Sequence, residues 1–129
     1  MEDILKLMQN QPELYVMESA SEEEIIQAET ALGLRFAADY RKYTAAFGAA
    51  SLATHELTGV CKSNRLNVVD VTIKERSKTK VSDQWYVLEQ TNIDSIVIWQ
   101  SNTGEIYQAN PDGVNKKIAE TLIEYLHLK

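Results

Sequence analysis

The spacing of apolar and polar residues predicts three helices in the first part of the chain. Apolar residues three or four positions apart give residues 2–9, 22–32 and 38–47 one apolar side each. The second helix has the clearest start signal, because Ser21 and Glu24 stand at the spacing of a capping box. The pattern therefore favours a helical beginning in which each helix buries one side against the rest of the chain.

The pattern changes to strands farther along the chain. Apolar and β-branched residues predict strands over residues 55–60, 84–89, 95–100 and 105–109. The last two are joined by Ser101-Asn102-Thr103-Gly104, which is typical of a hairpin connection. Strands that follow one another through short turns indicate an antiparallel sheet.

Two further segments complete the prediction. Residues 67–78 are ambiguous, because Asn67 is suited to cap a helix while the β-branched residues after it favour a strand; we predict a helix. Ile118 and Leu122 predict a final amphipathic helix over residues 114–127. The fold class is therefore α+β. A central antiparallel sheet of about four to six strands is expected, flanked by the N-terminal helices and a C-terminal helix.

Length and composition predict a single, acidic domain. The 129 residues, of which 44% are hydrophobic and 25% charged, form one domain over residues 1–129. The formal net charge is −6, and it is unevenly spread: residues 1–32 carry −7, residues 33–80 carry +5 and residues 81–129 carry −4. This balance argues against direct nucleic-acid binding and favours a basic partner.

Cysteine content and hydropathy limit the other function classes. The single cysteine excludes an intramolecular disulfide and makes a cysteine-based zinc site improbable. The longest apolar run, residues 96–99, is far shorter than a membrane span, and the N-terminus is acidic where a secretory signal is basic. We therefore expect a cytoplasmic protein with no membrane association, as a monomer or weak homodimer.

No catalytic constellation is visible, so we expect no enzyme activity, cofactor or metal. Cys61 lacks an obvious histidine partner, and His55 is expected at a sheet edge or in a loop. A metal-dependent hydrolase using Asp39, Asp70 or Asp94 is the weakest alternative, because no base, nucleophile and orienting group stand together.

Several segments, in order, resemble the SMI1/KNR4 (SUKH) family. The Glu-rich helix start is followed by Glu29-Thr30-Ala31-Leu32-Gly33, then Asp39-Tyr40, then a helix that ends at Gly48. Leu57-Thr58-Gly59-Val60, the hairpin around Thr103-Gly104 and the segment 118–126 resemble later parts of the family pattern. Ala37 departs from the pattern, because the family usually has proline there. The likeness covers residues 20–128.

The resemblance implies an α+β fold and a non-enzymatic protein-binding module of the bacterial immunity type. Such a protein binds and neutralises a cognate toxin, often a nuclease, of a polymorphic or contact-dependent system. The partner would be a basic toxin domain; the alternative is a regulatory or scaffold module that binds a host protein. We place partner contacts at acidic and aromatic positions: Glu22, Glu23, Glu56, Glu89, Asp94 and Trp99.

Overall fold

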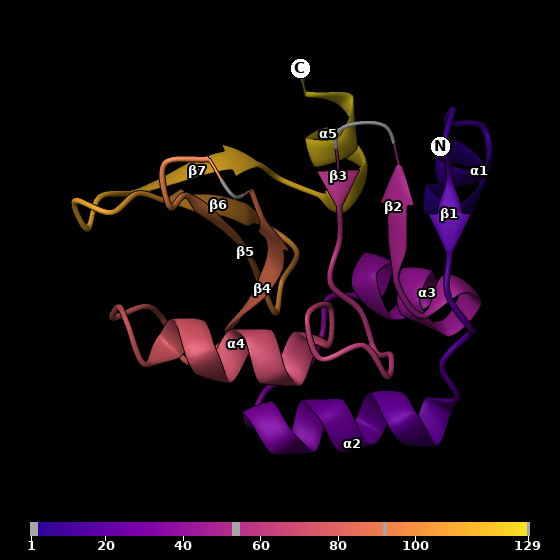
Figure 1. Cartoon of the computed structure of the whole chain (residues 1–129), viewed down its shortest axis with the longest axis horizontal. Coiled ribbons are helices and arrows are strands. Elements are labelled where there is room, and N and C mark those ends of the chain that lie inside the picture. The colour runs from indigo at the N-terminus through magenta and orange to yellow at the C-terminus, as the bar shows by residue number, and fades with distance from the viewer. Residues whose placement is uncertain (1–2, 53–54, 92, 129) are drawn as a thin grey trace.

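The computed structural model describes residues 3–52, 55–91 and 93–128. Along these residues the chain forms helices and strands in the order shown in Figure 1. The helices are α1 Ile4–Gln9, α2 Glu22–Leu32, α3 Ala38–Phe47, α4 Val68–Arg76 and α5 Leu122–His127. The strands are β1 Tyr15–Val16, β2 Ala50–Leu52, β3 His55–Glu56, β4 Trp85–Gln90, β5 Val97–Ser101, β6 Ile106–Ala109 and β7 Asn115–Ala119.

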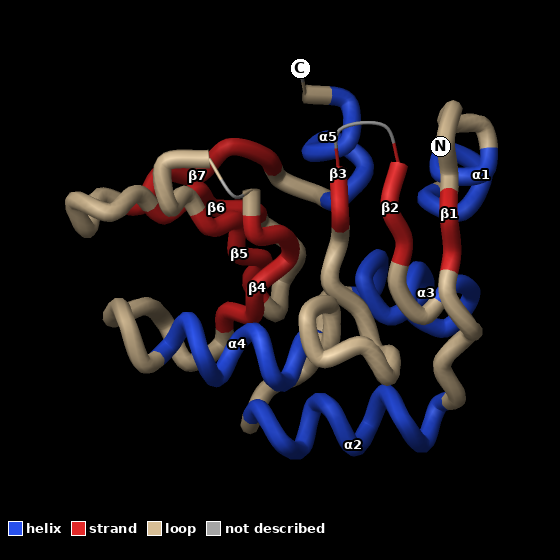
Figure 2. Tube along the Cα trace, in the orientation of Figure 1, coloured by secondary structure: helices blue, strands red, loops and turns tan. Residues whose placement is uncertain are grey.

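The strands form two antiparallel sheets, which confirms the predicted α+β class. The smaller sheet has the order β1-β2-β3, and the larger sheet has the order β4-β5-β6-β7. Figure 2 shows the two sheets side by side, with α2 and α4 below them. An isolated antiparallel bridge between Leu57 and Glu89 connects the segment after β3 to β4. The strands are thus divided between two sheets that meet at one junction.

The three helices predicted in the first part of the chain are present at the predicted positions in the sequence. In α2 the hydroxyl of Ser21 accepts the Glu24 amide at 3.1 Å, and the Glu24 carboxylate accepts the Ser21 amide at 2.9 Å. Gly33 ends α2 in the left-handed conformation, with φ of 69°. The first predicted helix is seen over Ile4–Gln9, and the remainder of its predicted range includes Glu2, which lies outside the described residues.

The ambiguous segment 67–78 is helical. The side chain of Asn67 accepts the amides of Val69 and Asp70 at 2.9 and 3.2 Å, which caps the start of α4. This cap and the burial of one side of the helix outweigh the strand preference of its β-branched residues, because tertiary packing overrides intrinsic propensity.

The predicted helix over residues 114–127 is wrong in its first half. Residues Asn115–Ala119 form β7, which pairs antiparallel with β6. The helix begins only at Leu122, after Thr121, whose hydroxyl accepts the Glu124 amide at 3.1 Å. The spacing of Ile118 and Leu122 imitates a helix although the two residues belong to different elements.

The larger sheet is covered on both faces. The main core cluster takes Tyr86, Leu88, Ile98 and Ile106 from it and joins them to the helices and the smaller sheet. On the other face a smaller cluster lies between the sheet and α4. Its members are Val71, Val87, Trp99 and Ala109. Alternating side chains of the same strands therefore serve two separate cores.

Buried tyrosines of α3 fix the position of the segment that follows β3. The hydroxyl of Thr58 donates its one proton to the Val87 carbonyl at 2.7 Å. The Tyr40 hydroxyl is therefore the donor in its 2.8 Å hydrogen bond with the Thr58 hydroxyl. The Tyr43 hydroxyl donates to the Thr58 carbonyl, also at 2.8 Å. Phe36 packs edge-on against Tyr40, with ring centroids 5.0 Å apart. This packing holds α3 against β4 and the chain between the sheets.

A buried polar chain holds α5 in place. The Tyr86 hydroxyl donates to the side-chain oxygen of Gln100 at 2.9 Å, and the Gln100 amide donates to Asp39 at 3.0 Å. The second carboxylate oxygen of Asp39 accepts the Leu122 amide at 2.9 Å, at the first residue of α5. Asp39, the first of the three aspartates considered for hydrolysis, therefore makes structural hydrogen bonds with both of its oxygens.

Two glycines bring backbone segments into close contact at the end of α3. A Cβ at Gly59 would lie 1.9 Å from the Gly48 carbonyl oxygen, and a Cβ at Gly48 would lie 2.1 Å from the Glu18 carbonyl oxygen. The Val60 amide donates to that Gly48 oxygen at 3.0 Å. The absence of a side chain at both positions allows this three-segment contact.

Candidate functional site

Two of the predicted partner-contact residues lie inside the protein. Trp99 is fully buried between the larger sheet and α4, and Glu89 is 4% exposed. The Glu89 carboxylate accepts hydrogen bonds from His55 Nδ1, the Glu56 amide and the Tyr125 hydroxyl. The expectation that these two side chains lie at a partner-facing surface is therefore corrected: Trp99 is a core residue, and Glu89 joins β3, β4 and α5.

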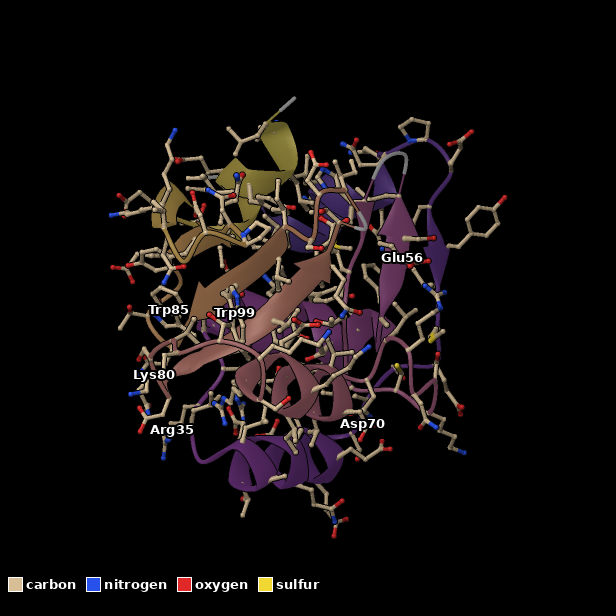
Figure 3. The ribbon with its side chains drawn as sticks, turned by 60° about the vertical axis from the view of Figure 1, so that its left-hand side comes forward. Arg35, Glu56, Asp70, Lys80, Trp85 and Trp99 are labelled. Carbon is tan, nitrogen blue, oxygen red and sulfur yellow. The ribbon has the colours of Figure 1, made fainter. Side chains whose placement is uncertain are left out.

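The other four predicted contact residues are at the surface, on three different parts of the fold. Glu22 and Glu23 are exposed in the first turn of α2. Glu56 is half-buried on β3 and forms an ion pair with Arg65; Figure 3 shows it near β2. Asp94 is exposed in the connection between β4 and β5. Glu22 and Glu23 are thus the one pair of neighbours among these four surface residues, while the Glu56 amide contacts the buried Glu89.

Cys61 and His55, the residues considered for catalysis, each make a structural contact. The thiol of Cys61 is partly exposed, with its pKa raised by burial, and it contacts the Ser63 carbonyl at 3.8 Å. His55 Nδ1 lies 3.0 Å from the Glu89 carboxylate. Within residues 3–52, 55–91 and 93–128 no three side chains of the metal-binding types gather to hold an ion.

Of the basic residues in α4, Arg76 makes structural hydrogen bonds and Lys74 is exposed to solvent. Arg76 donates to the carbonyls of Leu32, Asp83 and Trp85 at 3.2, 2.8 and 3.2 Å, so it ties the end of α4 to α2 and β4. Lys74 is exposed on the last turn of α4, where its charge suits the negative end of the helix dipole.

An apolar patch lies on β1 and the residue after it, at the opposite end of Figure 1 from the β6–β7 connection. Tyr15, Val16 and Met17 are 72%, 49% and 39% exposed, and we call these three residues the edge patch. Three consecutive exposed apolar residues are unusual on an acidic surface, and an exposed tyrosine is a typical anchor of protein interfaces.

A groove continues from the edge patch toward the start of α2. Its volume is about 340 Å³, and it is lined by residues 17–19, Glu24 and residues 60–63. Glu18 and Glu24 place two acidic side chains along it, and Lys62 places one basic side chain. We call it the N-terminal groove. Apolar contact and negative charge thus adjoin on one surface.

The acidic start of α2 is anchored to α3 by one arginine. The Arg41 guanidinium lies 2.9 Å from the Glu22 carboxylate and 3.0 Å from the Glu29 carboxylate. Burial alone would raise the pKa of Glu29, but hydrogen bonds from Arg41 and the Phe36 amide outweigh burial and lower this pKa below its ordinary value of 4.5. Glu29 therefore remains ionised, and Glu22 is held in place next to it.

We expect Glu29→Gln to lower the free energy of unfolding at pH 7 by about 2 kcal/mol, because it removes hydrogen bonds made to a charged acceptor. The lowered pKa means that this stabilisation is complete above pH 4.5 and is lost as the pH falls through the folded-state value. Urea unfolding of both proteins at pH 7 and at pH 3 measures the difference. A gap of equal size at the two pH values would contradict the proposed role of the charge.

The sequence reasoning missed the edge patch. Its signal is an apolar triplet between Glu13 and Glu18, outside any predicted element. A strand of two residues is too short for alternation to appear, so this triplet is identified only through its exposure in the fold.

Comparisons with known proteins agree with this fold. The family model described as SMI1-KNR4 cell-wall, SUKH_5, matches residues 1–128. No curated protein matches the chain. None of the helices in the described residues is long and apolar enough to cross a membrane. The match spans nearly the whole chain and includes the segments that carried the resemblance, so the chain belongs to the SMI1-KNR4 (SUKH) family.

Proposed function

We propose that this protein is a non-enzymatic binding module of the immunity type, which binds and neutralises a basic toxin domain. The observation that carries the proposal is the edge patch, where Tyr15 is 72% exposed beside acidic residues. Family membership supports a protein partner, and the net charge of −6 supports a basic one.

The proposed mechanism is stoichiometric occlusion. Negative charge around the edge patch attracts a basic surface and raises the association rate, while the apolar residues supply most of the affinity once water is excluded. A nuclease groove is basic because it binds phosphate, so an acidic protein that covers it or its surroundings blocks access to nucleic acid.

The experiment is capture of the products of adjacent reading frames by the purified protein, followed by an activity assay of any captured toxin-like domain. We expect Glu22→Lys with Glu23→Lys to slow association at least tenfold at low salt and to flatten its salt dependence, because both are exposed acidic residues in the turn of α2 that contributes Glu24 to the N-terminal groove. Surface plasmon resonance over a series of salt concentrations measures both effects.

The matched control is Asp83→Lys with Asp112→Lys, which changes the net charge equally at exposed positions outside the N-terminal groove. Equal slowing by both double variants would mean that net charge alone attracts the partner, and Glu22 and Glu23 would leave the proposed site. Capture of a host regulator in place of a toxin-like domain would favour the scaffold alternative.

A further inference from the structure

The register of the smaller sheet determines which main-chain groups of β1 are free. Tyr15 pairs with Ser51 and Val16 pairs with Ala50, while the Met17 amide donates to the Ala49 carbonyl at 2.9 Å. Hydrogen-bonding groups alternate sides along a strand, so Tyr15 and Met17 face β2. The N–H and C=O of Val16 consequently point to the outer edge of the sheet.

No strand of the described residues pairs with this outer edge. β1 is the terminal strand of the order β1-β2-β3, and Val16 is 49% exposed. Natural edge strands are usually protected by being very short, by charged side chains, proline or a bulge, or by a covering element. β1 is short, with two residues, so it offers a partner the main chain of Val16 rather than a long edge. The two residues of β1, Tyr15 and Val16, include neither lysine nor proline, and both have high strand propensity.

Charge selects the kind of strand that fits this edge. Glu13 and Glu18 are exposed on either side of the edge patch. A second copy of the protein paired antiparallel through β1 would bring the acidic ends of the two strands together, which disfavours a homodimer here. A strand with lysine or arginine would instead place its charge near Glu18 and Glu24 in the N-terminal groove.

We propose that an extended, basic segment of the protein partner adds to β1 as a fourth strand of the smaller sheet. Main-chain hydrogen bonds to Val16 hold the segment, and a lysine or arginine side chain enters the N-terminal groove. This inference rests on the proposed function and specifies how the partner binds. Strand addition suits the site because it needs only a free edge and neighbouring pockets for alternate side chains.

The decisive variant is Val16→Pro. Proline removes the N–H of Val16, which points away from β2, so the pairing of β1 with β2 is retained and the fold is preserved. Val16→Thr is the matched control, since it keeps the N–H and the branched shape. Circular dichroism and the thermal midpoint verify that both variants fold like the original protein.

The probe is a phage-displayed library of random nonapeptides, selected on the full chain. We expect enriched peptides with alternating β-branched residues and at least one lysine or arginine. Their binding to Val16→Pro should be at least tenfold weaker, and their binding to Val16→Thr unchanged. Hydrogen exchange at the Val16 amide should slow when they bind.

Enriched peptides that bind Val16→Pro as tightly as the original protein, or a selection that yields no peptide, would overturn strand addition. A toxin-like partner that is captured equally well by Val16→Pro would overturn this inference while leaving the proposed function intact. Absence of any captured partner, by contrast, is a failure of the proposed function.

Discussion

Gly59→Ala is expected to lower the free energy of unfolding by about 3 kcal/mol or more. The new Cβ would lie 1.9 Å from the Gly48 carbonyl oxygen and 2.7 Å from the Ala49 Cα, both backbone atoms. Neither can rotate away as a side chain would. The backbone of Gly59 cannot easily shift to relieve this contact, because its amide donates to the Leu66 carbonyl at 2.9 Å.

Urea unfolding of the purified variant measures this loss, and Gly113→Ala is its control. Gly113 has φ of 88° with open space around it, so alanine there meets backbone strain alone and should cost about 1 kcal/mol. Equal losses at the two glycines would show that the close approach at Gly59 relaxes easily and does not define the fold.

Glu89→Ala is the second substitution with a large expected effect, a loss of about 3 to 5 kcal/mol. The carboxylate accepts from His55 Nδ1 at 3.0 Å, from the Glu56 amide at 2.7 Å and from the Tyr125 hydroxyl. Its removal leaves these donors without their acceptor in the interior, where an unsatisfied polar group is costly. The junction of the two sheets should loosen at the same time.

Chemical denaturation and hydrogen exchange of β3 amides test this expectation. Glu89→Gln is the control, because it keeps a side-chain oxygen of similar shape while removing the charge, and we expect a smaller loss than for alanine. Should alanine and glutamine be tolerated equally, with β3 exchange unchanged, the carboxylate would have no part in joining the sheets.

Local signals were sufficient to predict the elements that are long or capped. Ser21 and Glu24 marked the start of α2 through a reciprocal pair that the fold retains. The hairpin between β5 and β6 was predicted for a similar reason, since its connecting residues stand between two runs of strand-forming residues. β1 and β2 were missed because strands of two and three residues are shorter than any detectable period.

The predicted site was less accurate because both faces of the larger sheet are covered, so most side chains of β4 and β5 are buried on whichever side they lie. Four successive residues of β4 are buried, and the register of β4 against β5 shifts between Val87 and Glu89. Trp99 is buried because α4 covers the face of the larger sheet that it occupies. Which face a distant helix covers is a tertiary property that local spacing does not contain.

Exposed acidic residues lie around β1 and the start of α2, and they are Glu13, Glu18, Glu22, Glu23 and Glu24. Residues 1–32 carry a formal charge of −7, and the remaining residues sum to +1. Asp3, Glu22 and Glu29 are paired with Lys42 and Arg41, whereas Glu13, Glu18 and Glu23 keep their charge at the surface. The field of an approaching basic protein therefore exerts a torque as well as an attraction, and it turns β1 and the start of α2 forward before contact. At physiological ionic strength this torque acts over roughly 8 Å, so the molecule is aligned only in the last step of the approach.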